Sequence, residues 1–199
     1  QPSILPILPK GIDLLPRPPH LDENSVKANE LFRYAIENIS DEVVVLAQAT
    51  SPFIESASIE AGIKAVLNEG YDSAFSAKKH QTYCWLGGDP INYDPSDMLQ
   101  TQDLDPVFAE TSGFYVFRRK DYLASNTRIN GETKIIEVDD RQAVDIDYPE
   151  DFNLAKAMLE FRPGDAVADS STSFLMELVG SNGFSRSIQH VAFDLDGVI

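Results

Sequence analysis

Apolar residues along the chain follow two kinds of pattern. In residues 24–39 they recur at helical spacing, which predicts an amphipathic helix. Residues 43–46 form a continuous and mostly β-branched apolar run, which is typical of a parallel strand covered on both faces. A second helix is predicted from residue 56 to a C-terminal glycine at position 70, and a short strand is predicted over residues 72–77.

The second half of the chain continues this alternation. Residues 113–118 and 134–138 predict strands, and residues 149–161 predict a helix. The side chains expected to face inward in that helix are Phe152, Ala155, Met158 and Leu159. Residues 87–106 have no period and predict a long loop or an excursion away from the sheet. The order of helices and strands predicts an α/β fold with a doubly wound, Rossmann-like sheet.

Composition narrows the class of partners. The 199 residues leave room for one domain and part of another, at roughly 150 residues per domain. The net charge of −16 disfavours nucleic acid and anionic membrane surfaces, and no apolar run approaches the ~20 residues needed to span a bilayer. Cys84 is the single cysteine, so an internal disulfide is excluded and we expect a cytoplasmic location.

The first candidate site follows the strand predicted over residues 43–46. In open α/β sheets, ligands bind at the carboxyl ends of strands, and here the chain continues as QATSP over residues 48–52. Gln48, Thr50 and Ser51 could donate and accept hydrogen bonds to a substrate. Alternatively, Thr50 and Ser51 only shape the turn before Pro52.

The second candidate site is AVDIDYPEDF over residues 143–152. Asp145 and Asp147 are two residues apart, so in an extended segment they point the same way and could bind a hard cation such as Mg²⁺. Alternatively, Asp147 caps the helix that follows, while Glu150 and Asp151 interact with its dipole. This alternative gives roles to Asp147, Glu150 and Asp151, but it gives no role to Asp145.

In this order, the two motifs resemble the N-acylneuraminate (sialic acid) cytidylyltransferases, the CMP-sialic acid synthetase family. The resemblance covers roughly residues 15 to 160, and the other stretches that carry it are RPPHLDENS (17–25), DSAFSAKKHQTYCW (72–85) and ETSGFYVF (110–117). Cytidylyltransferases for 3-deoxy-octulosonate typically have a QGDEP-like turn in place of QATSP. The turn of this chain therefore favours nonulosonic acids.

The resemblance implies a nucleotidyltransferase that transfers CMP from CTP to the anomeric hydroxyl of the sugar acid and releases pyrophosphate. Asp145 and Asp147 would be the catalytic pair that binds Mg²⁺. The resemblance implies that Gln48 and Thr50 contact the sugar acid and that Arg17 and Ser25 lie in the stretch that faces the nucleotide, and Ser51 joins the substrate-binding candidates from its place in the turn. The stretch from residue 80 toward 106 corresponds to the arm by which family members commonly form homodimers.

The chain departs from the family pattern in two places. The family begins with a strand and a basic loop similar to R-x-G-S-K-R, and no such loop occurs here, so residues 1–161 are expected to be a cytidylyltransferase domain truncated at its N-terminus. Many members have Asn-Gly where this chain has Thr111 and Ser112. Because Thr111 and Ser112 replace Asn-Gly, the resemblance does not define which sugar acid the chain would bind.

The C-terminal residues resemble a different family. VAFDLDGVI (191–199) is similar to the first motif of the haloacid dehalogenase (HAD) superfamily, in which Asp194 would be the nucleophile and Asp196 the acid-base residue. We therefore expect a linker over residues 162–189 and the first strand of a truncated HAD-like domain over 190–199. Two alternative functions follow: phosphatase activity of the HAD part on a sugar phosphate, and a fragment without catalytic activity.

Overall fold

A computed structural model describes residues 11–23, 25–160 and 191–194. Its main sheet has five strands in the order β6-β2-β5-β1-β7. In chain order these strands are β1 (Val43–Gln48), β2 (Ser73–His80), β5 (Val107–Arg118), β6 (Thr133–Val138) and β7 (Val191–Asp194). A separate small sheet pairs β3 (Trp85–Leu86) with β4 (Asp89–Pro90).

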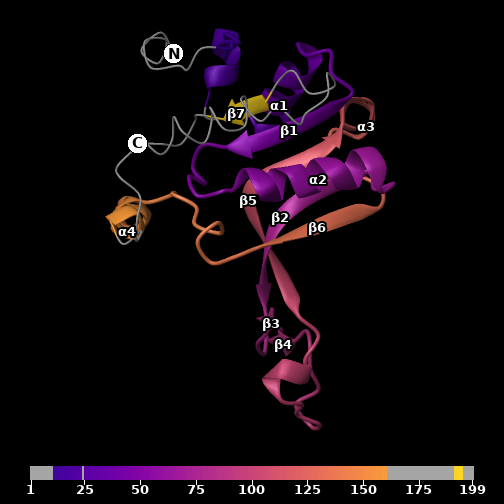
Figure 1. Cartoon of the computed structure of the whole chain (residues 1–199), viewed down its shortest axis with the longest axis vertical. Coiled ribbons are helices and arrows are strands. Elements are labelled where there is room, and N and C mark those ends of the chain that lie inside the picture. The colour runs from indigo at the N-terminus through magenta and orange to yellow at the C-terminus, as the bar shows by residue number, and fades with distance from the viewer. Residues whose placement is uncertain (1–10, 24, 161–190, 195–199) are drawn as a thin grey trace.

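Helices cover both faces of the main sheet (Figure 1). In the described residues, the α-helices are α1 (Ala28–Glu37), α2 (Ser56–Asn68), α3 (Arg119–Ser125) and α4 (Pro149–Glu160), and the 3₁₀ helices are η2 (Pro19–Asp22) and η3 (Thr101–Asp103). β1 pairs in parallel with β7, β2 pairs in parallel with β6, and β5 runs antiparallel to β1 and β2. The doubly wound α/β fold predicted from the sequence is confirmed, with a mixed rather than an all-parallel sheet.

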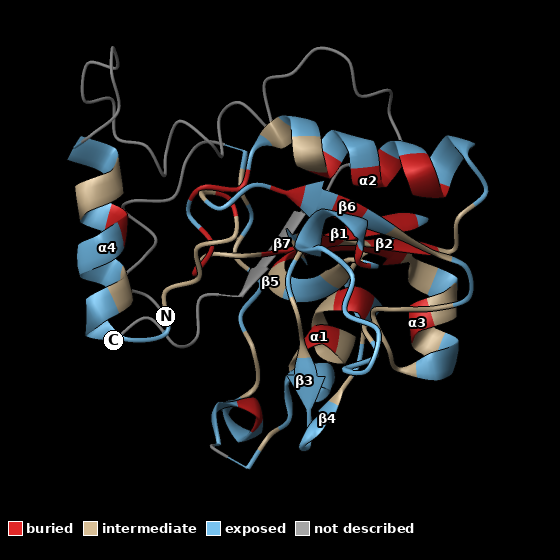
Figure 2. Cartoon of the chain, turned by 90° about the horizontal axis from the view of Figure 1, so that it is seen from below, coloured by how far each residue is buried: buried red, intermediate tan, exposed pale blue. Residues whose placement is uncertain are grey.

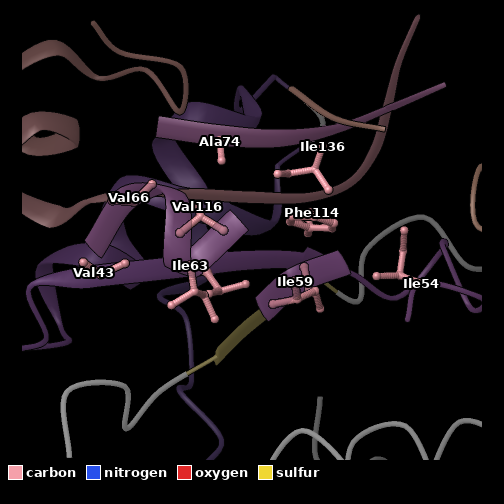
Figure 3. Close-up of a cluster of buried hydrophobic side chains, with 11 residues drawn as sticks. Val43, Ile54, Ile59, Ile63, Val66, Ala74, Phe114, Val116 and Ile136 are labelled. Carbon is pink, nitrogen blue, oxygen red and sulfur yellow. The ribbon is translucent and has the colours of Figure 1, made fainter. Parts of the chain in front are cut away.

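The helix α2 packs on one face of the sheet. Its buried residues Ile59, Ile63 and Val66 meet Val43 of β1 and Phe114 of β5 in one apolar cluster (Figure 3). The strand β1 is buried on both faces over Val43–Ala47, which explains why its sequence is apolar without alternation.

The helices α1 and α3 cover the opposite face. Phe32 and Ile36 of α1 pack with Phe117 of β5 and with Tyr122 of α3, whose hydroxyl donates a 3.0 Å hydrogen bond to the carbonyl oxygen of Asn29. No turn signal separates β5 from α3 in the sequence, so α3 was not predicted. The helix α1 begins at Ala28 instead of residue 24, because a turn closed by Val26 N–H and Glu23 O precedes it.

Residues between β2 and β5 extend away from the sheet as an arm that carries β3, β4 and η3 (Figure 1). Most of the arm is exposed (Figure 2). The predicted excursion over residues 87–106 is therefore confirmed, although β2 and β5 extend further into the arm than the sequence indicated. Tyr93 makes edge contacts with Tyr83 and Trp85 and holds the arm together, with ring centroids 4.7 and 6.3 Å apart.

The predicted inward face of α4 is wrong in two of its four positions. Ala155 is buried, but Phe152 is 52% exposed and Leu159 is 40% exposed. Figure 2 shows α4 to one side of the sheet with most of its surface exposed. Helical spacing predicts which residues share a face, but it does not predict whether another element covers that face.

The predicted linker over 162–189 lies outside the described residues, as do residues 190 and 195–199. Within the described ranges, none of the helices has both the length and the apolar character that crossing a membrane requires. The strand β7 pairs with β1 in the main sheet, with Asp194 opposite Gln48 in the register. The division of the chain into a cytidylyltransferase domain, a linker and a HAD-like strand stays a prediction.

Candidate functional site

The turn after β1 buries two small polar side chains. The strand ends at Gln48, and the N–H of Ser51 donates a 3.2 Å hydrogen bond back to the carbonyl oxygen of Gln48. Thr50 is 8% exposed and Ser51 is 4% exposed. The hydroxyl of Ser51 is buried and has no hydrogen-bond partner. A buried hydroxyl without a partner is unfavourable, so it is a candidate for a ligand contact.

A second loop, between β6 and α4, reaches this turn. The N–H of Ile146 donates a 2.9 Å hydrogen bond to the carbonyl oxygen of Thr50. Ile146 lies between Asp145 and Asp147, so the structure brings the predicted carboxylate pair next to the predicted polar turn. The two candidate sites of the sequence are therefore neighbours at the carboxyl end of β1.

The two carboxylates differ in their surroundings. The Oδ1 atom of Asp145 is buried without a hydrogen-bond partner, whereas Asp147 is exposed. Asp151, in the first turn of α4, binds back to the residues that precede the helix: its Oδ2 atom accepts hydrogen bonds from the N–H groups of Asp147 (3.1 Å) and Tyr148 (2.9 Å). This leaves the Asp147 side chain available for another partner.

Two further contacts join the loops, and the sequence did not reveal them. Gln142 is 7% exposed, and its Oε1 atom accepts hydrogen bonds from the N–H of Glu55 (3.2 Å) and the hydroxyl of Ser58 (2.7 Å). The guanidinium of Arg141 lies 4.8 Å from the ring centre of Phe53. The first contact joins the β6–α4 loop to the start of α2 and the second joins it to the β1–α2 connection, and no sequence pattern identifies such long-range pairs.

A bulge in β5 lies beside the turn. The pairing of β2 with β5 shifts between Phe75 and Ala77, and the hydroxyl of Ser76 anchors the displaced strand. It accepts hydrogen bonds from the hydroxyl of Thr111 (2.8 Å) and the N–H of Phe114 (3.1 Å). Bulges occur often next to functional sites, where they redirect side chains.

The bulge contains the two residues that depart from the family pattern. Ser112 has a φ of 60°, a conformation that glycine adopts without strain, which gives a physical reason for the Asn-Gly common in the similar family. A Cβ atom on the next residue, Gly113, would lie 2.5 Å from Cδ1 of Ile54. The bulge therefore packs directly against the loop that follows β1.

An open pocket of about 470 Å³ lies at the ends of β2 and β6. It is lined by Lys78, Lys79 and residues 137–141, and so it borders the β6–α4 loop. Lys78 Nζ lies 2.9 Å from Asp140 Oδ1, and this hydrogen bond, with the charge of the ammonium, lowers the pKa of the Asp140 carboxyl. The pocket carries charges of both signs.

The other predicted residues have local contacts. Arg17 forms an ion pair with Asp22, and the hydroxyl of Ser25 donates a 3.4 Å hydrogen bond to Glu23. Neither contact tests a role toward a nucleotide, which stays a prediction. Asp194 ends β7, whereas Asp196 lies outside the described residues.

Among the described residues, no group of three or more His, Cys, Asp and Glu side chains is arranged to hold a metal ion. The predicted site has only two carboxylates. Mg²⁺ commonly uses one or two carboxylates, with water and substrate phosphates completing its shell. The buried Asp145 oxygen without a partner fits such an ion.

Two known proteins that are similar in sequence belong to the family that the motifs resemble. No family model matches the chain. It is 25% identical over 155 residues to N-acylneuraminate cytidylyltransferase A of Danio rerio, and 24% identical over 155 residues to N-acylneuraminate cytidylyltransferase of Oncorhynchus mykiss. Each alignment covers 73% of this chain, but only 36% and 35% of those relatives. These matches confirm the resemblance to the N-acylneuraminate cytidylyltransferases.

The chain also has a weak likeness to a solved structure. The 4-diphosphocytidyl-2C-methyl-D-erythritol synthase of Anaerococcus prevotii has a TM-score of 0.49 and 14% identity, with 68% of each chain covered.

Proposed function

We propose that this chain is part of an enzyme that transfers CMP from CTP to the anomeric hydroxyl of a sialic-type (nonulosonic) sugar acid. The observation that carries the proposal is the contact between Ile146 and Thr50, which joins the two motifs of the similar family at the carboxyl end of β1. The named relatives support the same activity. The HAD-type phosphatase is not favoured by these relatives.

In the proposed reaction, the anomeric oxygen attacks the α-phosphorus of CTP and loses its proton. The bond between the α-phosphorus and the bridging oxygen breaks, and pyrophosphate leaves. Gln48, Thr50 and Ser51 bind and orient the sugar acid. The free hydroxyl of Ser51 supports this role because a substrate oxygen would satisfy it. Arg17 and Ser25 contact the nucleotide.

Asp145 and Asp147 hold Mg²⁺ in this proposal. When bound, the ion supplies positive charge that neutralises phosphate oxygens in the transition state. The β6–α4 loop buries one oxygen of the Asp145 carboxylate and leaves Asp147 at the surface, so that the pair spans the edge of the site. Burial of the Asp145 oxygen strengthens its interaction with a cation, because the local dielectric is lower than that of water.

The arm serves as the surface for a homodimer in the same proposal. Apolar side chains are exposed along it, namely Trp85, Leu86, Ile91, Met98 and Leu99. Exposed apolar groups that lie together are typical of protein interfaces. A cytoplasmic location, which the single cysteine favours, also belongs to the proposal, as does the absence of nucleic acid and membrane partners, which the acidic charge favours.

The test measures pyrophosphate release by the full-length gene product that contains this chain, with CTP, Mg²⁺ and a panel of nonulosonic acids. Asp145→Asn and Asp147→Asn are expected to lower kcat by about 100-fold, with little effect on folding. Asp140→Asn is the matched control, since it removes an exposed carboxylate of the same loop and should leave kcat within a few-fold.

Three outcomes would contradict parts of the proposal. If the unmodified protein transfers CMP to none of the sugar acids, the activity is refuted. If Asp145→Asn keeps the same dependence on Mg²⁺ concentration, the metal assignment is refuted. If the protein transfers no CMP but releases phosphate from sugar phosphates in a manner that requires Asp194, the phosphatase alternative replaces the proposal.

A further inference from the structure

Gln142 caps a helix to which it is not adjacent in sequence. The residue at the N-cap of α2, Glu55, makes no side-chain capping hydrogen bond. Instead, the Oε1 atom of Gln142 accepts hydrogen bonds from the N–H of Glu55 at 3.2 Å and from the hydroxyl of Ser58 at 2.7 Å. The first turn of α2 is thus fastened to the β6–α4 loop through one nearly buried amide oxygen.

The loop around Gln142 is itself tightly turned. The Oδ1 atom of Asp139 accepts a 2.8 Å hydrogen bond from the N–H of Gln142, and the carbonyl oxygen of Asp139 accepts one of 3.0 Å from Ala143. These bonds fix the backbone immediately before Asp145. A shift of Gln142 would therefore move the backbone of Asp145, because the short segment between them is held by hydrogen bonds.

Asp145 lies between two attachments. On one side, Gln142 is bonded to the start of α2, and on the other, Ile146 is bonded to the carbonyl oxygen of Thr50. Both attachments lead to the same β1–α2 connection. Only two residues separate Gln142 from Asp145, so the backbone that carries the carboxylate has little freedom to move relative to Thr50.

We infer that Gln142 is a positioning residue that sets where Asp145 lies relative to Thr50 and Ser51. The inference rests on the proposed function for its catalytic consequence, but its structural part can be tested without substrate. Gln142 supplies a hydrogen-bond acceptor, because its Oε1 atom accepts both of its hydrogen bonds to the start of α2. A side chain of similar length with an acceptor should replace it, and one without an acceptor should not.

The experiment compares Gln142→Met with Gln142→Glu. Methionine keeps the length and removes the acceptor, whereas glutamate keeps an acceptor beside the N-terminus of a helix, where negative charge is favourable. Hydrogen exchange of the Ile146 amide reports the attachment to Thr50 directly. We expect exchange about 10-fold faster in Gln142→Met and within a few-fold of the original in Gln142→Glu.

The catalytic consequence is measured in the full-length gene product. In Gln142→Met, kcat should fall about 10-fold and the Mg²⁺ concentration for half-maximal rate should rise several-fold, with KM for CTP little changed. Gln142→Glu should restore both. A purely structural role would lower the amount of folded protein without changing the Mg²⁺ dependence.

Ser58→Ala provides a second variant if Gln142→Met does not fold. It removes one of the two donors to Oε1 and leaves the loop sequence intact, so it should shift the Ile146 exchange and the Mg²⁺ dependence in the same direction by a smaller factor.

Unchanged exchange of the Ile146 amide in both Gln142→Met and Ser58→Ala would overturn the inference, and so would faster exchange with unchanged kcat and Mg²⁺ dependence. Absence of CMP transfer in the unmodified protein would instead refute the proposed function. The exchange result would then still decide whether Gln142 holds Asp145 in place.

Discussion

The N–H of Ile146 donates a 2.9 Å hydrogen bond to the carbonyl oxygen of Thr50. This bond joins the loop after β6 to the loop after β1, although β2 and β5 separate the two strands in the sheet. The β6–α4 loop therefore crosses the carboxyl edge of the sheet to reach the polar turn. Around this contact lie two buried polar atoms without partners, Ser51 Oγ and Asp145 Oδ1.

Ser51→Ala should separate stability from activity. The hydroxyl of Ser51 is buried without a partner, so removing it should leave the free energy of unfolding unchanged or raise it by up to about 1 kcal/mol. If the hydroxyl binds substrate, kcat/KM should fall about 10-fold. Urea unfolding and steady-state kinetics measure the two effects.

Ser76→Ala is the matched control for that variant. It removes another buried hydroxyl, but one that holds the bulge of β5 through Thr111 and Phe114. We expect a loss of about 1–3 kcal/mol in the free energy of unfolding. Equal changes in the free energy of unfolding of the two serine variants would contradict the finding that the Ser51 hydroxyl has no hydrogen-bond partner.

Gly113→Ala should destabilise the protein through one contact. A Cβ atom there would lie 2.5 Å from Cδ1 and 2.9 Å from Cγ1 of the buried Ile54, and relieving the clash should cost about 1–3 kcal/mol. Thermal unfolding measures the loss. In an Ile54→Val background, which removes Cδ1, the same substitution should cost less. An equal cost in both backgrounds would show that the contact is not responsible.

Ser112→Val should also destabilise the protein, by about 1–2 kcal/mol, because a β-branched side chain is strained at a φ of 60°. Ser112→Gly is the control and should stay within about 1 kcal/mol of the original chain in urea unfolding. A tolerated valine would mean that the backbone at this position differs from the one described.

Stability at alkaline pH should depend on Tyr115. Burial raises the pKa of Tyr115 to about 12, and a hydrogen bond to Glu110 adds to the shift. An unfolded tyrosine ionises near pH 10, so between pH 10 and 12 the unfolded state loses a proton that the folded state keeps. The stabilising contribution is complete below pH 10 and is lost as the pH rises toward 12, by up to about 2–3 kcal/mol.

Urea unfolding at several pH values tests this expectation. Tyr115→Phe should reduce the decline above pH 10, whereas Tyr148→Phe, at a tyrosine that is 69% exposed, should leave it unchanged. Parallel declines in the original chain and in Tyr115→Phe would assign the alkaline sensitivity to other groups.

Much of the fold was predictable because its elements are strongly patterned. The run at 43–46 became β1, and the helical spacing after residue 56 became α2, since both elements bury the residues that define the pattern. The outward face of α4 was not predictable, because exposure of Phe152 depends on what lies beside the helix. The helix α3 was missed because the chain enters it directly from β5.

By itself, the sequence determined the fold class, the two candidate motifs and the resemblance that connects them, because residue type and spacing are local properties of a chain. Only the tertiary structure decided that Thr50 and Ile146 are bonded, that Gln142 caps α2, and which polar atoms are left without a partner. These relationships arise between loops far apart in the chain. They depend on how the sheet brings its strand ends together, which no local pattern encodes.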